Sequence, residues 1–267
     1  MFAGHCPVAF ANTHNIGAHQ PASAETPAPA KTFKPQTLVV PTEDGFLLNA
    51  TLYRPAGAKK APVIVLLHNL GGTQRDWEPM ISPLKQAGYA VLTMDIRGHG
   101  KSAARGYKPT AHPKRFTSWR LLTEAEWQKV PADTVLMLRH LVSHSKDYPG
   151  IDPKNVAILG ASVGANAAML AGQTYAHRVQ AIGLLSPRLA YKDLSIAIAA
   201  VEYPGAVFLS ASQSDKQAFD AAQKLYQMVP GSKSIRLLKD AGQGTDMLQY
   251  YPPLMTDLTD WLKRVLG

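Results

Sequence analysis

The sequence has only one cysteine, Cys6, among its 267 residues. A single cysteine cannot form an intramolecular disulfide, and it excludes zinc sites built mainly from cysteine ligands. Long apolar runs are missing too, since no segment approaches the roughly 18 uninterrupted apolar residues that a membrane-spanning helix needs. Hydrophobic residues nevertheless make up 46% of the chain and charged residues 18%. This balance predicts a chain that buries a sizeable core and excludes global disorder.

The chain has a net charge of +9. One strongly basic stretch of it contains no acidic residue. From Arg97 to Arg120 the sequence has no Asp or Glu but seven basic residues: Arg97, Lys101, Arg105, Lys108, Lys114, Arg115 and Arg120. Two interpretations stay open, a solvated loop and a surface that attracts anionic ligands or anionic surfaces. Nucleic-acid binding is not expected, because no recognisable nucleic-acid-binding fold accompanies the charge.

Residues 1–36 differ in composition from the rest of the chain. Pro, Ala, Ser and Thr dominate from Gln20 to Pro35, which predicts an extended, poorly packed linker. The segment from Met1 to Ala11 is mildly apolar but lacks the basic region of a signal peptide. We expect either a disordered cytoplasmic tail or an export-related segment, with an exported or periplasmic location slightly favoured. The sequence leaves open whether Met1 is the true start.

Residues 37–267 show regular alternation and are predicted to form one domain. Eight candidate strands cover residues 37–40, 47–53, 62–68, 90–95, 155–160, 180–185, 205–210 and 234–239. Candidate helices cover residues 75–87, 124–143, 162–175, 216–228 and 252–266. Several strands are continuous apolar runs, as expected for strands covered on both faces. Two early strands followed by strand–helix alternation predict a doubly wound, mostly parallel eight-stranded sheet of the α/β class.

The segment after the sixth candidate strand is too short to form a large cap. Only residues 188–204 separate Pro187 from Gly205, and they contain one short apolar segment, 194–201, that we expect to be helical. The sequence therefore predicts a minimal lid. We expect a shallow pocket roofed by this helix and by the basic loop with Phe116 and Trp119.

The clearest local motif is Gly160-Ala161-Ser162-Val163-Gly164. It follows an apolar strand and precedes an Ala-rich helix, which is the strand–turn–helix context that a G-x-S-x-G nucleophile elbow requires. In that geometry Ser162 projects above the N-terminus of its own helix. The helix dipole and the nearby amides there favour a developing oxyanion.

A second motif, His68-Asn69-Leu70-Gly71-Gly72, directly follows the third candidate strand. Glycines at this point allow backbone amides to face a substrate oxygen, as in the loop that forms part of an oxyanion hole. We predict that the backbone N–H groups of Leu70 and Val163 are the oxyanion donors. An ordinary glycine turn is the alternative.

These motifs resemble those of the α/β-hydrolases, and in particular the dienelactone-hydrolase-like and serine-aminopeptidase-like esterase groups. The resemblance extends from Thr37 to Gly267 and includes the strand order, the His68–Gly72 loop, the Asp95–Gly100 block, the elbow and the terminal helix. It implies a serine hydrolase that acts on small ester or acyl substrates. It implies no metal and no organic cofactor.

The resembling groups order their catalytic triad as Ser, acid and His. Asp215 lies where the acid of these groups falls, and Asp220 is a weaker alternative further along the chain. Asp215 would also suit the N-cap of the following helix. At the position of the histidine, after the last strand, the sequence has Gln243, and no histidine occurs after His177.

Glutamine changes the chemistry that this position can perform. Its amide donates and accepts hydrogen bonds but cannot act as a base at neutral pH. Two functions therefore stay open: a weakly active serine hydrolase, and a catalytically degenerate member that binds a ligand or partner. His68 and His99 are kept as alternative bases, because both follow strands at the edge of the sheet where ligands bind.

Overall fold

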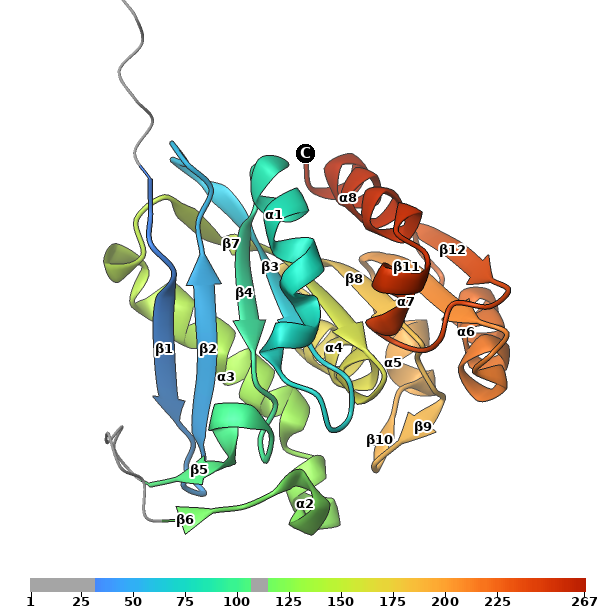
Figure 1. Ribbon diagram of the computed structural model, residues 1–267, viewed down its shortest axis with the longest axis horizontal. Coiled ribbons are helices and arrows are strands. Elements are labelled where there is room, and N and C mark those ends of the chain that lie inside the picture. The colour runs from blue at the N-terminus through green and yellow to red at the C-terminus, as the bar shows by residue number, and fades with distance from the viewer. Residues whose placement is uncertain (1–31, 107–114) are drawn as a thin grey trace, which may run out of the picture. The chain divides into compact units, whose positions relative to one another are not determined.

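Eight strands form one sheet in the order β1-β2-β4-β3-β7-β8-β11-β12 in the computed structural model (Figure 1). The structure describes residues 32–106 and 115–267, so the predicted tail up to residue 31 lies outside the described residues. The strands of this sheet are β1 (Gln36–Pro41), β2 (Leu47–Tyr53), β3 (Ala61–Leu67), β4 (Ala90–Met94), β7 (Ile151–Ala161), β8 (Val179–Leu185), β11 (Ala206–Ser212) and β12 (Lys233–Leu238). All eight predicted strands are present.

The first two strands of the sheet run antiparallel to their neighbours, and the strands that follow them in the chain pair in parallel with one another. β1 pairs antiparallel with β2, and β2 pairs antiparallel with β4. Every remaining neighbour in the sheet is parallel. The predicted doubly wound, mostly parallel α/β sheet is confirmed, and the carboxyl ends of its central strands lie at one edge.

Helices cover both faces of the sheet, and β3 shows how its sequence divides between them. Val63, Val65 and Leu67 belong to the core beneath one set of helices, whereas Ile64 and Leu66 belong to the core on the other face. Both sets are fully buried, which explains why the strand is a continuous apolar run. The first core is covered by α3 (Val130–Ser143), α4 (Val163–Thr174), α5 (Ala197–Glu202) and α6 (Lys216–Met228).

The second core is covered by α1 (Glu78–Gln86), α7 (Asp246–Tyr250) and α8 (Pro253–Leu266). Helix α8 has the amphipathic spacing expected from the sequence, with Leu254, Leu258 and Trp261 buried. The predicted helix over 124–143 is divided into α2 (Glu124–Trp127) and α3, whose second residue is Pro131. Proline is tolerated in a first helical turn but breaks a continuous helix, so α3 begins afresh there.

The lid segment differs from the prediction of one helix over 194–201. Strands β9 (Ala190–Tyr191) and β10 (Leu194–Ser195) form a small hairpin, and α5 follows it. Lys192 and Asp193 form the turn with positive φ angles of 49° and 61°. Two such residues are typical of the tight turns that match the twist of a hairpin. A minimal lid is present, with strand β10 in place of the first two residues of the predicted helix.

Within residues 32–106 and 115–267, no helix combines the length and apolar character needed to cross a membrane.

Candidate active site

The predicted elbow has an unusual backbone conformation at Ser162. Its φ is 56° and its ψ is −119°, between the end of β7 and the start of α4. A non-glycine residue in this region costs on the order of 1–3 kcal/mol, and such residues cluster at functional sites. The flanking glycines are required by close approach: a Cβ on Gly160 would lie 2.1 Å from the carbonyl oxygen of Gly164.

The hydroxyl of Ser162 has no hydrogen-bond partner in the described part of the chain, although the residue is only 8% exposed. Its backbone N–H donates to the carbonyl of Leu185 at 2.9 Å, which ties the elbow to the end of β8. The elbow is therefore fixed through its backbone. Among residues 32–106 and 115–267, no base is hydrogen-bonded to its side chain.

The two predicted oxyanion donors are unbonded backbone amides. The N–H groups of Leu70 and Val163 make no hydrogen bonds with residues that the structure describes. Val163 is the first residue of α4, where amides have no partner within the helix. The loop that contains Leu70 is a turn closed by the N–H of Gly72, which donates to the carbonyl of Asn69 at 3.0 Å. Their role as oxyanion donors stays a prediction.

His68 has both ring nitrogens occupied by the backbone. The N–H of Ile96 donates to His68 Nε2 at 2.9 Å, so Nε2 is an acceptor and carries no proton. Nδ1 must then carry the proton and donate it to the carbonyl of Asn69, 2.7 Å away. Burial is the main effect on the pKa of His68 and lowers it. His68 thus joins the β3 and β4 loops as a neutral ring.

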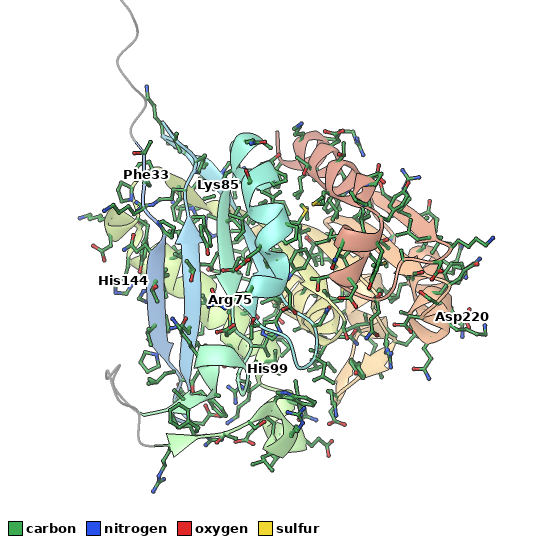
Figure 2. All side chains as sticks on the ribbon, in the orientation of Figure 1. Phe33, Arg75, Lys85, His99, His144 and Asp220 are labelled. Atoms are coloured by element: carbon green, nitrogen blue, oxygen red, sulfur yellow. The ribbon has the colours of Figure 1, made fainter. Side chains whose placement is uncertain are left out.

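His99 follows β4 at the end of the sheet where α2 also lies (Figures 1 and 2). The N–H of Gly71 donates to His99 Nε2 at 3.1 Å, and His99 Nδ1 donates to the carbonyl of Arg97 at 3.0 Å. Its ring stacks on Trp119 with 5.6 Å between centroids. Burial, with the nearby ring of His68, lowers the pKa of His99 to about 4. Both alternative bases therefore have both ring nitrogens in use.

Asp215 lies at the N-terminus of α6, as the sequence predicted. Its Oδ1 accepts from the N–H of Ala218 at 3.2 Å and caps the helix. The same oxygen lies 3.6 Å from a guanidinium nitrogen of Arg188. Within residues 32–106 and 115–267, no hydrogen bond joins this carboxylate to the side chain of Gln243. Asp220 instead pairs with Lys216 on the outer face of α6.

Gln243 lies in a tight loop between β12 and α7. The loop is flanked by Gly242 and Gly244, whose φ angles are 70° and 54°. The side chain of Gln243 is exposed, and among the described residues it has no hydrogen-bond partner. Gln243 and Asp215 line the same cavity of about 390 Å³, which Arg188, Ser214, Lys216, Gln217, Gly242 and Asp246 complete. Ser162 is not part of its lining, so the structure brings two of the three predicted triad positions together there.

Sequence reasoning missed the residues that hold these loops together. The buried amide of Asn166 donates to the carbonyls of Arg188 and Leu194, both at 2.8 Å, and so joins α4 to the lid. Ser186 Oγ accepts from the N–H of Gly244 at 2.8 Å. These pairs are 22 to 58 residues apart in sequence. Only the placement of an Asn one turn after the elbow serine could have drawn attention to one of them.

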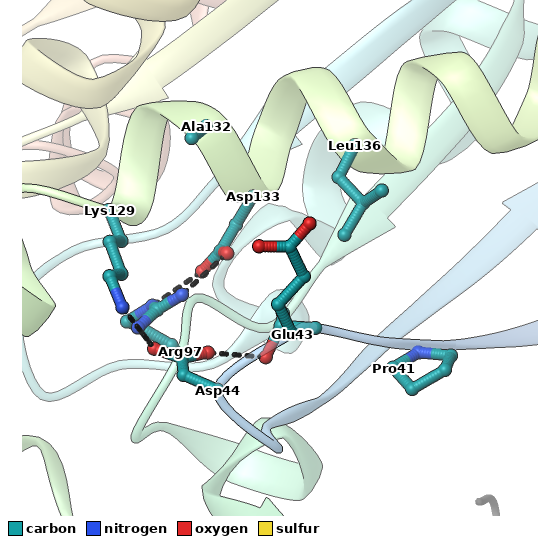
Figure 3. A pocket seen from close by; sticks show the side chains of 9 residues that line it. Pro41, Glu43, Asp44, Arg97, Lys129, Ala132, Asp133 and Leu136 are labelled. Atoms are coloured by element: carbon teal, nitrogen blue, oxygen red, sulfur yellow. Dashed lines mark hydrogen bonds and ion pairs between the residues drawn. The ribbon is translucent and has the colours of Figure 1, made fainter. Parts of the chain in front are cut away.

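Arg97 does not contribute to a basic surface. It is 1% exposed and forms two hydrogen bonds of 2.6 Å with the carboxylate of Asp133 on α3 (Figure 3). Its third contact, 2.9 Å, is to Asp44, which Lys129 also approaches at 3.0 Å. Burial raises the pKa of Asp133 to about 6, against the lowering effect of Arg97. Arg97 therefore links the β1–β2 turn to α3.

The rest of the basic stretch is partly neutralised as well. Arg105 pairs with Glu126 of α2. Lys108 and Lys114 lie outside the described residues, whereas Arg115 and Arg120 are exposed. Phe116, expected to roof the pocket, is 68% exposed, and Trp119 instead stacks on His99.

The part of the chain that the structure describes has no group of three His, Cys, Asp or Glu side chains placed to hold a metal ion.

Comparison with known proteins decides the family. A family model described as serine aminopeptidase, S33, matches residues 58–229. The chain belongs to this family. It also resembles two proteins called esterase FrsA from strains of Klebsiella pneumoniae, with 28% and 27% identity over 147 residues. That match covers 54% of this chain and 29% of each relative, so the chain spans less than a third of the length of these relatives.

Solved structures of similar fold include several hydrolases. A dienelactone hydrolase from Anabaena variabilis has a TM-score of 0.66 at 19% identity and covers 88% of this chain and 100% of its own. An esterase from Pyrococcus furiosus has a TM-score of 0.66 at 18% identity and covers 88% and 92%. An acetyl xylan esterase from Paenibacillus sp. R4 has a TM-score of 0.64 at 17% identity and covers 86% and 89%. This chain therefore has the α/β-hydrolase fold, as its motifs predicted.

Proposed function

We propose that this chain binds a small ester or acyl compound at the Ser162 elbow and hydrolyses it slowly. Ser162 is the nucleophile in this proposal, and the amides of Leu70 and Val163 receive the oxyanion. Asp215 and Gln243 occupy the positions of the acid and the histidine. The observation that carries the proposal is the state of His68 and His99, whose ring nitrogens are all bonded to backbone groups. Neither ring is free to take the proton of Ser162.

The reaction begins when Ser162 Oγ bonds to the acyl carbon and the carbonyl oxygen becomes an oxyanion. The hydroxyl proton passes to solvent water, because Gln243 has no basic atom at neutral pH. The leaving alkoxide takes a proton from water, and a second water releases the acid from the serine. Oxyanion donors and binding alone leave on the order of 10³–10⁴-fold acceleration over water. We therefore expect turnover far below that of a complete triad.

A catalytically degenerate binding protein is the second candidate function. The unbonded side chain of Gln243 on a cavity of about 390 Å³ favours it, because a free amide can hold a ligand by both donating and accepting. In this case the ligand is an ester or acyl analogue that is bound but not turned over. The exposed basic residues that the structure describes in this stretch, Lys101, Arg115 and Arg120, are proposed to attract anionic ligands or surfaces to the same molecule.

Replacing Gln243 by His tests the proposal. We expect the Gln243→His variant to hydrolyse p-nitrophenyl acetate at least about 100-fold faster than wild type, which corresponds to about 2.7 kcal/mol of barrier. Adding Ser162→Ala should abolish the gain. A fluorophosphonate probe should label wild type slowly and the histidine variant rapidly.

Wild-type activity equal to that of the histidine variant would contradict the proposed role of Gln243. A folded but inactive histidine variant that still binds an acyl analogue would favour the degenerate binding protein.

A further inference from the structure

Asp215 has a cationic partner although the position of the triad histidine is neutral. The guanidinium of Arg188 lies 3.6 Å from Asp215 Oδ1. The Asp215 side chain is 12% exposed and that of Arg188 25%, so this pair is more sheltered than a typical surface ion pair. In a working triad the carboxylate balances the imidazolium that forms during the reaction. Here the arginine is already present beside it.

Arg188 is held in this place from both ends. Its backbone N–H donates to Asn166 Oδ1 at 3.1 Å, and its carbonyl accepts from Asn166 Nδ2 at 2.8 Å. Its guanidinium donates to Gln217 Oε1 at 2.9 Å and lies 4.6 Å from the ring centroid of Tyr191. Because Asn166 is buried on α4, the arginine is fixed relative to the helix that begins at the elbow. Its position is therefore set by the fold.

Four charged residues line the cavity that contains Gln243: Arg188, Asp215, Lys216 and Asp246. Lys216 is 83% exposed and pairs with Asp220 at 2.8 Å, on the outer face of α6. Asp246 lies on α7, and burial together with the charge of Asp76 raises its pKa. Arg188 is therefore the cation that directly faces the Asp215 carboxylate among the described residues.

We propose that Arg188 is a positioning residue that replaces the triad imidazolium as the counter-ion of Asp215. This inference rests on the proposed function, because it takes Asp215 and Gln243 as the acid and histidine positions. A guanidinium stays charged at every relevant pH, so it balances the carboxylate but cannot take a proton from Ser162. Arg188 and Gln243 together thus supply what a single histidine would: a positive charge and a hydrogen-bonding side chain, without a base.

The proposal predicts that Arg188 opposes the return of a histidine at position 243. An imidazolium there would lie near a positive charge, and a like charge lowers the pKa of a histidine. The new base would be protonated only at lower pH, and Asp215 would be shared between two cations. Removing the charge of Arg188 should free Asp215 for the imidazole.

The experiment compares the Gln243→His variant with Gln243→His/Arg188→Gln and with Gln243→His/Arg188→Met. The pKa of the introduced imidazole is measured by NMR titration of its Cε1–Hε1 signal, assigned by comparison with wild type. We expect this pKa to rise by about one unit in both neutral variants. Arg188→Lys, which keeps the charge, should keep the lower pKa. Gln243→His/Lys224→Gln is the matched control. Lys224 is an exposed cation of α6 that forms no ion pair with Asp215.

Equal pKa values in the Gln243→His variant with and without the Arg188 charge would overturn the proposal, provided that circular dichroism shows both to be folded. A shift of equal size in the Lys224→Gln control would overturn it as well, because any distant cation would then act alike. The rate of p-nitrophenyl acetate hydrolysis separates this inference from the proposed function. A pKa shift without any gain in rate upholds the role of Arg188 and contradicts that of Gln243 in catalysis.

Discussion

Asn69 and Thr245 bond to each other twice, across 176 residues of sequence. Asn69 Nδ2 donates to Thr245 Oγ1 at 2.7 Å, and the N–H of Thr245 donates to Asn69 Oδ1 at 3.2 Å. One residue precedes the predicted oxyanion donor Leu70, and the other follows the Gln243 loop. These two hydrogen bonds therefore fix the distance between the Asn69 loop and the loop that contains Gln243.

Replacing Asn69 by Ala should loosen both loops. The change leaves the N–H and hydroxyl of Thr245 without their partner, and we expect the free energy of unfolding to fall by about 1–3 kcal/mol. Urea denaturation measures the change. Asn155→Ala is the control, because the Oδ1 atom of Asn155 is buried without a hydrogen-bond partner. Equal losses in both variants would show that the link between the loops contributes nothing particular.

Ser162→Gly should stabilise the fold. Glycine adopts positive φ freely, so the variant releases the backbone strain of the elbow, and no hydrogen bond of the described residues is lost with the hydroxyl. We expect a gain of about 1 kcal/mol, seen as a higher melting temperature. Ser186→Gly is the matched control at a φ of 50°, but its hydroxyl accepts from Gly244. A gain in the control as large as at Ser162 would mean that the hydroxyl of Ser186 is unimportant.

Acid should destabilise the protein partly through His99. Its pKa is lowered from 6.5 to about 4 in the folded chain, chiefly by burial. Between these values the unfolded chain binds more protons, so the stabilising effect is present above pH 6.5 and is lost as the pH falls toward 4. The loss amounts to at most about 3 kcal/mol. His99→Asn should therefore flatten the decline of unfolding free energy over this window, and an unchanged slope would contradict the argument.

Salt should weaken binding to anionic vesicles if the basic stretch forms a surface. Exposed charges are screened over about 10 Å at 0.1 M salt, so affinity should fall as salt is raised. Replacing Lys108, Lys114 and Arg115 together by Ser should reduce affinity and its salt dependence, measured by co-sedimentation. Arg97 is left unchanged because it is buried against Asp133. No change in the triple variant would favour a merely solvated loop.

The sheet was predictable because its strands depend on local pattern. Apolar runs such as Val63 to Leu67 are buried on both faces, so burial and sequence carry the same information. The lid was predicted less well. The segment from Leu194 to Val201 has an apolar composition that suits a helix, but positive φ angles at Lys192 and Asp193 start a hairpin that includes Leu194 and Ser195. Turn chemistry outweighed helix propensity there.

Only part of the candidate site could be predicted from the sequence. The elbow at Ser162 and the cap at Asp215 follow from short motifs, and both are at the predicted turns. Arg188 could not be predicted, because its contact with Asp215 depends on how β8 and β11 lie side by side. The neutral state of His68 and His99 was equally hidden, since it arises from backbone groups of two loops that meet only after folding.

The amide of Asn166 joins the helix that begins at the elbow to Arg188, just before the lid hairpin, and to Leu194, the first residue of β10. Between these anchoring points lie Leu189, strand β9 and the turn of Lys192 and Asp193. This turn is therefore the place where extra sequence can enter the lid without disturbing Ser162. Lengthening that turn, in evolution or by engineering, would therefore enlarge the lid while the backbone of the elbow keeps its geometry.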